Sequence, residues 1–410
     1  MRVTSACERR GKAAGARVVS RRAGAVGAVL VLAGLLAGPV QADDVRDRQR
    51  WVLDAVNAEE AWKVTRGSGV TVAVIDSAVD PKVGVLKGKV TVAPDMRSSA
   101  FDDGPVAAGP HGTAMASLIA ASGRGGGMLG VAPDANILSI PVISEEQSDY
   151  DLVEPDDGLG LPTESPLSRA LRYATDHGAK VISMSLGEYI TQRADRQAVA
   201  YALARGVVLV AAVGNDGDSQ AARRLGTSFW SFPAGYAGVI GVGAVDKKGN
   251  PAGFSSDNLS VLVGAPGVDV VAALPGGGYE EVEGSSASTA LVAGAVALIK
   301  AKYPNLTPEL VARALTSTTR NRPAARYDDK VGFGVVDAAA ALTRAGQLSG
   351  YSSALPVQSN LHFGNGTTAP APSPPGPDPV RLWVYGAGVL LGLVAFGAAV
   401  VVLTRRSERQ

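Results

Sequence analysis

Residues 70–80 read VTVAVIDSAVD. The stretch begins with the apolar run Val70–Ile75, which consists of small and β-branched residues and is followed by the carboxylate of Asp76. A continuous apolar run of this length is typical of a strand buried on both faces of a parallel sheet. Four further runs share this character, namely Ile137–Val142, Lys180–Ser185, Val207–Val213 and Val239–Val245. Because they alternate with longer helical patterns, the sequence predicts an α/β domain with a mainly parallel sheet between helices.

The helical patterns are expected to begin at His111, near Pro166, near Arg193, at Ser286 and at Thr307. In the last of them Thr307 precedes a proline, which is the arrangement of an N-cap followed by the first helical position. Crossover helices of this kind complete the parallel sheet that the strands predict.

The first 42 residues have the pattern of a secretory signal peptide. Seven Lys/Arg residues precede an apolar run from Ala23 to about Ala37, and Val40-Gln41-Ala42 supplies small residues for cleavage after Ala42. A retained N-terminal anchor is the alternative, although the run is short for a membrane span. Arg21-Arg22 leaves the twin-arginine export route open.

A second apolar segment lies near the C-terminus. Leu382–Leu403 is 22 residues long without a charge, enough to cross a bilayer of about 30 Å. Trp383 and Tyr385 stand at its start, and three arginines follow it. The positive-inside rule places the basic tail in the cytoplasm and the body of the chain outside, as a single-pass protein of the cell membrane.

These segments divide the chain into five parts. Six of the ten residues from Pro370 to Pro379 are proline, a composition typical of an extended, semi-rigid spacer. The predicted parts are a signal peptide (1–42), an α/β domain (43–345), a Pro-rich linker (346–380), a transmembrane helix (381–403) and a cytoplasmic basic tail (404–410).

Composition limits the partners. Basic residues concentrate at the two ends, so the body between them is mildly acidic, which argues against nucleic-acid binding. The only cysteine, Cys7, leaves with the signal peptide, so the exported domain is expected to have no disulfide.

Seven carboxylates between Glu145 and Asp157 suggest either a calcium loop or a solvated acidic loop. Their spacing fits no ligand pattern, so no metal or cofactor is predicted.

Only three histidines are present, at positions 111, 177 and 362. His177 stands where a helix is expected to end, and His362 lies in the linker, so His111 is the candidate general base. Asp76, at a strand terminus, needs a partner if it is buried and ionised. An imidazole N–H is one such partner; an ordinary loop carboxylate is the alternative.

Ser286 and Asn215 are the other candidates for chemistry. Ser286 follows Gly284-Ser285 at the start of a helical pattern, where a hydroxyl activated by a base becomes a nucleophile. An N-cap serine is the alternative there. Asn215 follows the run Val207–Val213, and its side-chain N–H suits a developing oxyanion, although asparagine is also common in turns.

Three motifs carry a family resemblance. VAVIDSAVD around Asp76, HGTAMASLIAA from His111 and GSSASTALVAGAVAL around Ser286 resemble the aspartate, histidine and serine motifs of the subtilisin-like serine proteases, or subtilases. VISMSLG, AAVGN and VGFGVVDAAAAL resemble further segments of that family, so the likeness extends from about Gln49 to Leu342. It implies a subtilisin-like three-layer domain with an Asp76-His111-Ser286 triad and Asn215 as oxyanion donor.

The resemblance also implies where a polypeptide substrate binds. Ser185-Leu186-Gly187 and Ala212-Val213-Gly214 would line the S1 site, which holds the side chain before the scissile bond. The first of these segments would pair with the extended substrate as an added strand.

Several motif positions depart from the family pattern. Ala78 stands for glycine, and Met115 and Ser117 for valine and glycine. In the serine motif the departures are Ser285 for threonine, Ala287 for methionine and Ala290 for proline. None removes a reacting group, but a misalignment of about 1 Å costs about 10²-fold in rate.

The outer segments resemble those of mycosins, the membrane-anchored subtilases of type VII secretion systems in actinobacteria. The shared features are a signal peptide, the lead-in Arg46–Trp51, a Pro-rich linker and a C-terminal membrane helix. Mycosins commonly carry disulfides in this domain, unlike this chain.

Asp76 lies only 33 residues after Asp43, so no long inhibitory propeptide is expected before it.

The leading hypothesis is a membrane-anchored, extracytoplasmic serine endopeptidase associated with a type VII secretion membrane complex. A structural subunit of that complex with weak or no turnover is the alternative, motivated by the motif departures. A free nutrient protease is a third hypothesis, against which the membrane helix argues.

Overall fold

The computed structural model describes residues 42–97, 107–143, 164–350 and 379–407. The chain divides into two compact units, one ending at Tyr351 and one beginning at Ser352. The predicted signal peptide apart from Ala42, the acidic segment Glu145–Asp157 and most of the predicted linker lie outside the described residues.

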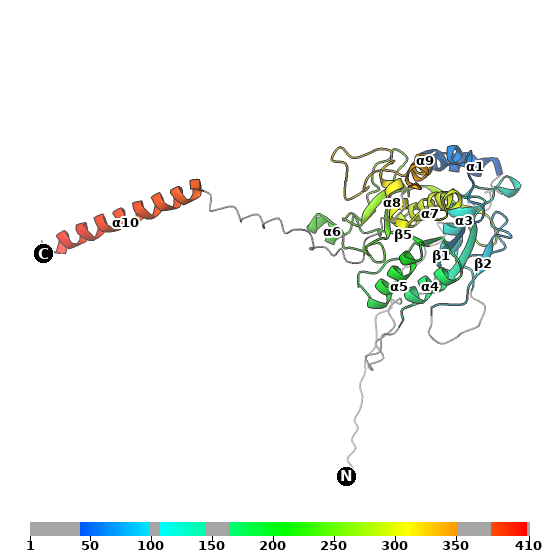
Figure 1. The fold of residues 1–410 in the computed structure, drawn as a ribbon, viewed down its shortest axis with the longest axis horizontal. Coiled ribbons are helices and arrows are strands. Elements are labelled where there is room, and N and C mark those ends of the chain that lie inside the picture. Colours follow the sequence, from blue (N-terminus) through cyan, green and yellow to red (C-terminus); the bar gives the residue numbers. More distant parts are fainter. Residues whose placement is uncertain (1–41, 98–106, 144–163, 351–378, 408–410) are drawn as a thin grey trace, which may run out of the picture. The chain divides into compact units, whose positions relative to one another are not determined.

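The first unit is built on a seven-stranded parallel sheet in the order β2-β3-β1-β4-β5-β6-β7 (Figure 1). Its strands are β1 (Thr71–Asp76), β2 (Val90–Val92), β3 (Asn136–Pro141), β4 (Val181–Met184), β5 (Val208–Ala212), β6 (Ile240–Val245) and β7 (Val261–Pro266). A separate antiparallel pair is formed by β8 (Val270–Ala273) and β9 (Tyr279–Val282). The predicted α/β architecture with a mainly parallel sheet is confirmed.

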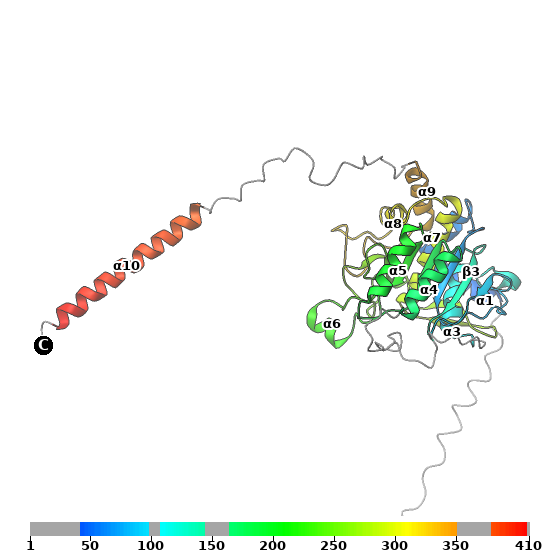
Figure 2. The ribbon, with the colours of Figure 1, turned by 60° about the horizontal axis from the view of Figure 1, so that its bottom comes forward.

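Helices cover both faces of the sheet (Figure 2). The helices of the first unit are α1 (Ala42–Ala55), α2 (Ala58–Trp62), α3 (Pro110–Ala120), α4 (Pro166–Asp176), α5 (Arg193–Ala204), α6 (Gln220–Leu225), α7 (Ser285–Lys302), α8 (Pro308–Thr316) and α9 (Ala338–Leu348), with a short 3₁₀ turn, η1 (Arg124–Gly126). Helices α3 and α7 share one core with one set of strand residues, while α4 and α5 share a second core with the other set.

Strand β1 shows how one run serves both cores. Val72 and Val74 belong to the core of α3 and α7, whereas Ala73 and Ile75 belong to the core of α4 and α5. Successive side chains of a strand point to opposite faces, so a strand covered on both faces needs apolar residues at every position. This is why the strand runs of the sequence are continuous rather than alternating.

The N-terminal helices tie distant parts of the domain together. Arg46 donates to the carbonyls of Gly123, Gly126 and Gly127 at 2.9 to 3.1 Å. Gln49 exchanges two hydrogen bonds with the backbone of Leu129, at 2.6 and 2.8 Å. Past the end of α1, Asn57 Nδ2 donates to Asp337 Oδ1 at 2.9 Å, so the first helices contact the start of α9.

The second unit contains α10 (Pro379–Ser407). Within it, Leu382–Leu403 is a helix long and apolar enough to cross a membrane, with a mean hydropathy of 2.5. These are the bounds that the sequence predicts for the apolar segment.

Candidate active site

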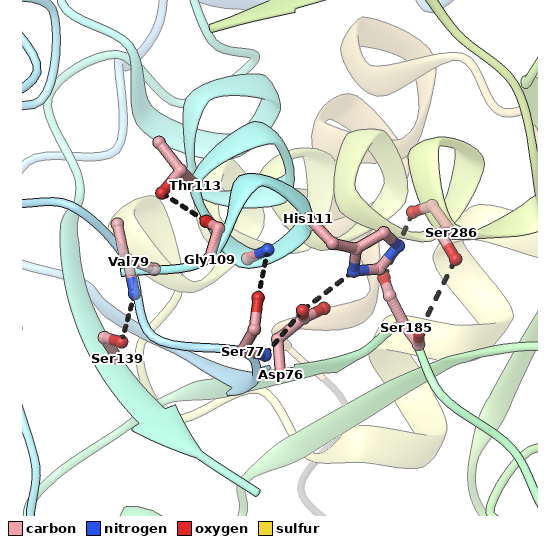
Figure 3. Close-up of polar contacts among 10 residues, drawn as sticks. Asp76, Ser77, Val79, Gly109, His111, Thr113, Ser139, Ser185 and Ser286 are labelled. Atoms are coloured by element: carbon pink, nitrogen blue, oxygen red, sulfur yellow. Dashed lines mark hydrogen bonds and ion pairs between the residues drawn. The ribbon is translucent and has the colours of Figure 1, made fainter. Parts of the chain in front are cut away.

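The first candidate pair lies where β1 ends and α3 begins. Asp76 is the last residue of β1 and is fully buried. His111 is the second residue of α3, and its Nδ1 lies 2.7 Å from Asp76 Oδ1 (Figure 3). An ionised carboxylate only accepts, so Nδ1 carries the proton in this hydrogen bond. The carboxylate therefore fixes the tautomer that leaves Nε2 free of a proton in the neutral ring.

Backbone contacts hold the two elements at this separation. Gly112 N donates to Ser77 Oγ at 2.9 Å, and Gly109 N donates to Ala78 O at 2.7 Å. The approach requires glycine at position 112, because a Cβ there would lie 2.0 Å from Ser77 O. Ser77 N also donates to Asp76 Oδ1 at 2.7 Å, which stabilises the negative charge.

Ser286 lies on the other side of the His111 ring from Asp76 (Figure 3). It is the second residue of α7, whose N-cap is Gly284, so the alternative that Ser286 is an N-cap is wrong. Its Oγ donates to Ser185 O at 3.5 Å, and Ser185 Oγ donates to Ser286 O at 3.2 Å. The first bond is at the long end of the hydrogen-bond range, so it holds the Ser286 hydroxyl only weakly.

Asn215 lies beside the start of the same helix. Its Oδ1 accepts from Ser285 N at 2.9 Å and from Ser285 Oγ at 3.0 Å. Since a backbone N–H can only donate, these contacts identify the oxygen of the amide and direct Nδ2 elsewhere. A Cβ on Gly284 would lie 3.4 Å from Asn215 Nδ2 and 3.7 Å from Ser286 N. Two N–H donors therefore border one small space beside the Ser286 hydroxyl.

The two segments predicted to line S1 follow neighbouring strands. Ser185-Leu186-Gly187 continues β4, and Ala212-Val213-Gly214 ends β5 and continues beyond it. The sheet brings these segments side by side at the carboxyl ends of its strands, where α/β proteins bind ligands. Asn215 is exposed and Ser286 half-buried, so a ligand can reach both side chains.

One titratable group beside this region, Glu188, has a pKa that its surroundings shift. Burial raises the pKa of Glu188, the residue after Gly187; the hydrogen bond from Gln192 opposes the shift and the charge of Asp195 adds to it. Among the described residues no group of three or more His, Cys, Asp or Glu side chains is arranged to hold a metal ion.

The other candidate residues take structural positions. His177 is the C-cap of α4, and its ring stacks on Tyr173, as its place at a helix end predicts. His362 lies outside the described residues. Thr307 is the N-cap of α8 and Pro308 is the first residue of the helix, as the sequence predicts, although the Thr307 side chain makes no capping hydrogen bond.

The motif departures fill buried positions without disturbing the contacts above. Met115, Ala287 and Ala290 are buried in the core of α3 and α7. Ser117 Oγ donates to Ala114 O at 2.7 Å and accepts from Ala273 N at 3.0 Å, so its hydroxyl is satisfied inside that core.

Sequence reasoning missed two residues that position this site. Ser285 orients the Asn215 amide, and Ser77 joins β1 to α3 through Gly112. Both directly adjoin a candidate residue, in Asp76-Ser77 and Ser285-Ser286. That adjacency is the only signal the sequence offers for them.

A family model described as the Subtilase family, Peptidase_S8, matches residues 67–334, more than half of the chain. The chain belongs to the subtilase family. Fervidolysin of Fervidobacterium pennivorans is 33% identical over 320 residues, covering 71% of this chain and 43% of fervidolysin. Subtilisin E of Bacillus subtilis (strain 168) is 36% identical over 255 residues, covering 62% of this chain and 61% of subtilisin E.

Solved structures also resemble this subtilase over most of its length. The MycP3 protease from the type VII (ESX-3) secretion system has a TM-score of 0.58 at 30% identity, covering 71% of this chain and 87% of MycP3. MycP1 from Mycobacterium smegmatis has a TM-score of 0.56 at 30% identity, covering 71% of this chain and 84% of MycP1. The predicted subtilisin-like fold and the predicted similarity to mycosins are both confirmed.

Proposed function

We propose that this subtilase is a serine endopeptidase in which Asp76, His111 and Ser286 form the catalytic triad. The observation that carries the proposal is the 2.7 Å hydrogen bond from His111 Nδ1 to the buried Asp76 carboxylate, beside the half-buried Ser286. This pair orients a neutral imidazole as a base toward a hydroxyl at a helix N-terminus.

Catalysis proceeds in two acyl-transfer steps. Ser286 Oγ attacks the scissile carbonyl carbon while His111 Nε2 takes the hydroxyl proton, and Asp76 stabilises the imidazolium that forms. Asn215 Nδ2 and the Ser286 N–H donate to the oxyanion. His111 then gives its proton to the departing amine, and a water molecule, activated by the same base, hydrolyses the acyl-enzyme.

The substrate of this proposal is an extended polypeptide. The segment Ser185–Gly187 offers backbone groups at the edge of the cleft, where a peptide adds as a strand. Together with Ala212–Gly214 it lines the S1 site. No cofactor takes part in the proposed reaction.

Labelling with a fluorophosphonate tests this function, because the reagent reacts with an activated serine hydroxyl. We expect the wild-type protein to be labelled and the variants Ser286→Ala and His111→Ala to lose the label. The matched control is Ser288→Ala. In the wild type the Ser288 hydroxyl donates to Ala265 O and Pro266 O inside the core, away from the proposed triad. An unlabelled wild type would support the alternative of a structural subunit without turnover.

We further propose that α10 anchors the enzyme in the cell membrane, with the subtilase domain on the extracytoplasmic side. The length and hydropathy of Leu382–Leu403 support this placement, as does the basic tail that follows. The full chain should resist alkaline extraction from membranes, whereas a chain ending at Asp378 should be released. Release of both forms would contradict the anchor.

The likeness to MycP3 and MycP1 supports association with a type VII secretion membrane complex. The test is crosslinking of the full chain in membranes of its own host, followed by identification of the attached proteins. We expect components of a secretion complex, and their absence would remove this part of the proposal.

A further inference from the structure

Exposed apolar side chains are concentrated in one part of the subtilase domain. Among the described residues of this domain, eight large hydrophobic side chains are exposed. Two of them, Val64 and Val92, are isolated from the rest in the sequence. The other six lie in three short segments and are Tyr189, Ile190, Leu225, Phe229, Trp230 and Leu259. These six residues are called the apolar patch below.

Contacts in the structure bring the three segments of the apolar patch together. The Tyr189 ring meets the Phe229 ring edge to face, with the ring centroids 6.2 Å apart. Asn258 Nδ2 donates to Phe229 O at 3.2 Å, which places the neighbouring residue Leu259 beside the same loop. Leu225 is the last residue of α6, which leads into that loop. The segments therefore form one region of the surface, although they are far apart in the sequence.

Trp230 packs against the backbone and still presents much of its side chain to solvent. A Cβ on Gly235 would lie 3.1 Å from Trp230 Cε3, so the indole ring lies close to that glycine. Trp230 is nevertheless 44% exposed, and Phe229 is 58% exposed. Soluble proteins rarely expose apolar side chains in large groups, and such groups mark contacts with another protein or with a membrane.

The exposed charges in the segments around the apolar patch are all positive. Residues 189–196 and 220–230 expose four arginines and no carboxylate, because their only acidic residue, Asp195, is buried. The arginines are Arg193, Arg196, Arg223 and Arg224. One exposed carboxylate, Asp218, precedes the second segment. Aromatic and aliphatic side chains beside arginines are typical of surfaces that lie in the headgroup region of a bilayer, and the arginines complement anionic headgroups.

We propose that the apolar patch docks the subtilase domain on the surface of an anionic lipid bilayer, with the aromatic rings in the headgroup region and the arginines against lipid phosphates. The inference rests on the proposed membrane anchor α10. Residues 351–378 tether the domain to this anchor, so docking is an intramolecular step with a high effective concentration of bilayer. A patch that binds lipid only weakly is therefore occupied in the anchored protein.

Trp230 is a native reporter of this contact. The full chain with Trp383→Phe, which removes the tryptophan of the proposed membrane helix, is reconstituted into vesicles of phosphatidylcholine and phosphatidylglycerol. Its fluorescence is compared with and without phosphatidylcholine brominated in the acyl chains, which quenches only nearby tryptophans. We expect quenching, and we expect its loss when Trp230→Phe is added. The remaining Trp51 and Trp62 lie on α1 and α2 and pack against the core.

A double variant tests whether the apolar patch makes the contact. Leu225→Glu combined with Phe229→Glu should abolish the quenching of Trp230 without unfolding the domain, because both side chains are exposed. Val64→Glu is the matched control, since Val64 is 55% exposed against 54% for Leu225. Val64 follows α2, which packs against α1 and α9, and α1 lies across the domain from α6 in both ribbon views (Figures 1 and 2). This control should keep the quenching.

An unquenched Trp230 in vesicle-bound protein, or unchanged quenching in the double variant, would overturn the inference. A lower kcat/KM of the double variant on a short soluble peptide would assign the apolar patch to substrate binding instead. Crosslinks between two copies that the double variant loses would assign it to self-association. A full chain that does not float with the vesicles would overturn both the anchor and the docking. Fluorophosphonate labelling should be equal in all variants, so failure of the protease function is seen separately.

Discussion

Asn215 and Ser285 form a two-point contact, in which the backbone N–H and the hydroxyl of Ser285 donate to the same Asn215 oxygen at 2.9 and 3.0 Å. The contact fixes the rotation of the amide, so its N–H group points away from Ser285. Preorganised donors stabilise an oxyanion without reorganisation during the reaction. Ser285 is therefore a positioning residue for the proposed oxyanion donor.

This contact predicts graded effects on turnover. Asn215→Ala should lower kcat by about 10² to 10³-fold with little change in KM, as is typical of removing one oxyanion donor. Ser285→Ala removes one of the two contacts and should lower kcat by a smaller factor, while Ser285→Thr, which keeps the hydroxyl, should restore it. Steady-state kinetics with one peptide substrate provide the measurement. Equal losses in Ser285→Ala and Ser285→Thr would contradict the positioning role.

The Asp76–His111 pair predicts the effect of removing a charge without removing the shape. Asp76→Asn presents an amide to the imidazole and favours the wrong tautomer, so kcat should fall by about 10⁴-fold. The variant should still fold, which circular dichroism can check. The idea fails if Asp76→Asn retains most of the wild-type kcat.

The close approach of α3 to β1 predicts a stability effect at Gly112. Gly112→Ala would place a Cβ 2.0 Å from Ser77 O, and overpacking of this kind costs about 1–3 kcal/mol. We expect a lower melting temperature and a lower kcat, because the residue next to His111 is displaced. Gly84→Ala is the control, since a Cβ there meets no atom within 4 Å. If both variants melted at the wild-type temperature, the packing argument would be wrong.

Much of this arrangement was predictable because the strand runs and motifs are local patterns. The five expected strands are present, with ends shifted by at most one residue. Strand β7 was missed although its six residues are largely buried, because Gly264 and Pro266 interrupt its apolar pattern. Edge strand β2 has only three residues, two of them exposed, which is too short a pattern to recognise.

The contacts within the site were less predictable because they join residues far apart in sequence. The residues alone left Asp76 with two alternatives, a partner of an imidazole or an ordinary loop carboxylate, and the family resemblance selected its pairing with His111, since strand order is not encoded in any single run. The role of Ser285 depends on which side chain lies opposite it, that of Asn215, 70 residues earlier in the chain. That information arises only when the loops pack.

A buried lysine predicts how stability depends on pH. Lys300 is 3% exposed, and its Nζ donates to Leu306 O at 2.9 Å and Gly206 O at 3.3 Å. Burial, helped by the charge of Lys180, lowers the pKa of Lys300 from 10.5 to about 8. Between these values the unfolded chain binds more protons at this residue than the folded chain, so its contribution to stability grows as the pH rises.

Melting curves of the wild type and of Lys300→Met, recorded from pH 7.5 to about pH 10.5, check the prediction. The upper limit is about the ordinary pKa of a lysine side chain. The melting temperature of the wild type should rise relative to that of the variant across this window. If the melting temperatures of the two proteins differed by the same amount at every pH, the Lys300 pKa would not change on folding.

The contacts of α1 and α2 carry a consequence for the order of folding. Gln49 pairs with a residue 80 positions later, and Asn57 with one 280 positions later. Chain closure over such separations is slow, because its entropic cost precedes any gain from contact. Helices α1 and α2, which precede the other described elements of the domain in the chain, are thus among the last to be held in place. A chain that has not yet been translated to Asp337 cannot complete the domain.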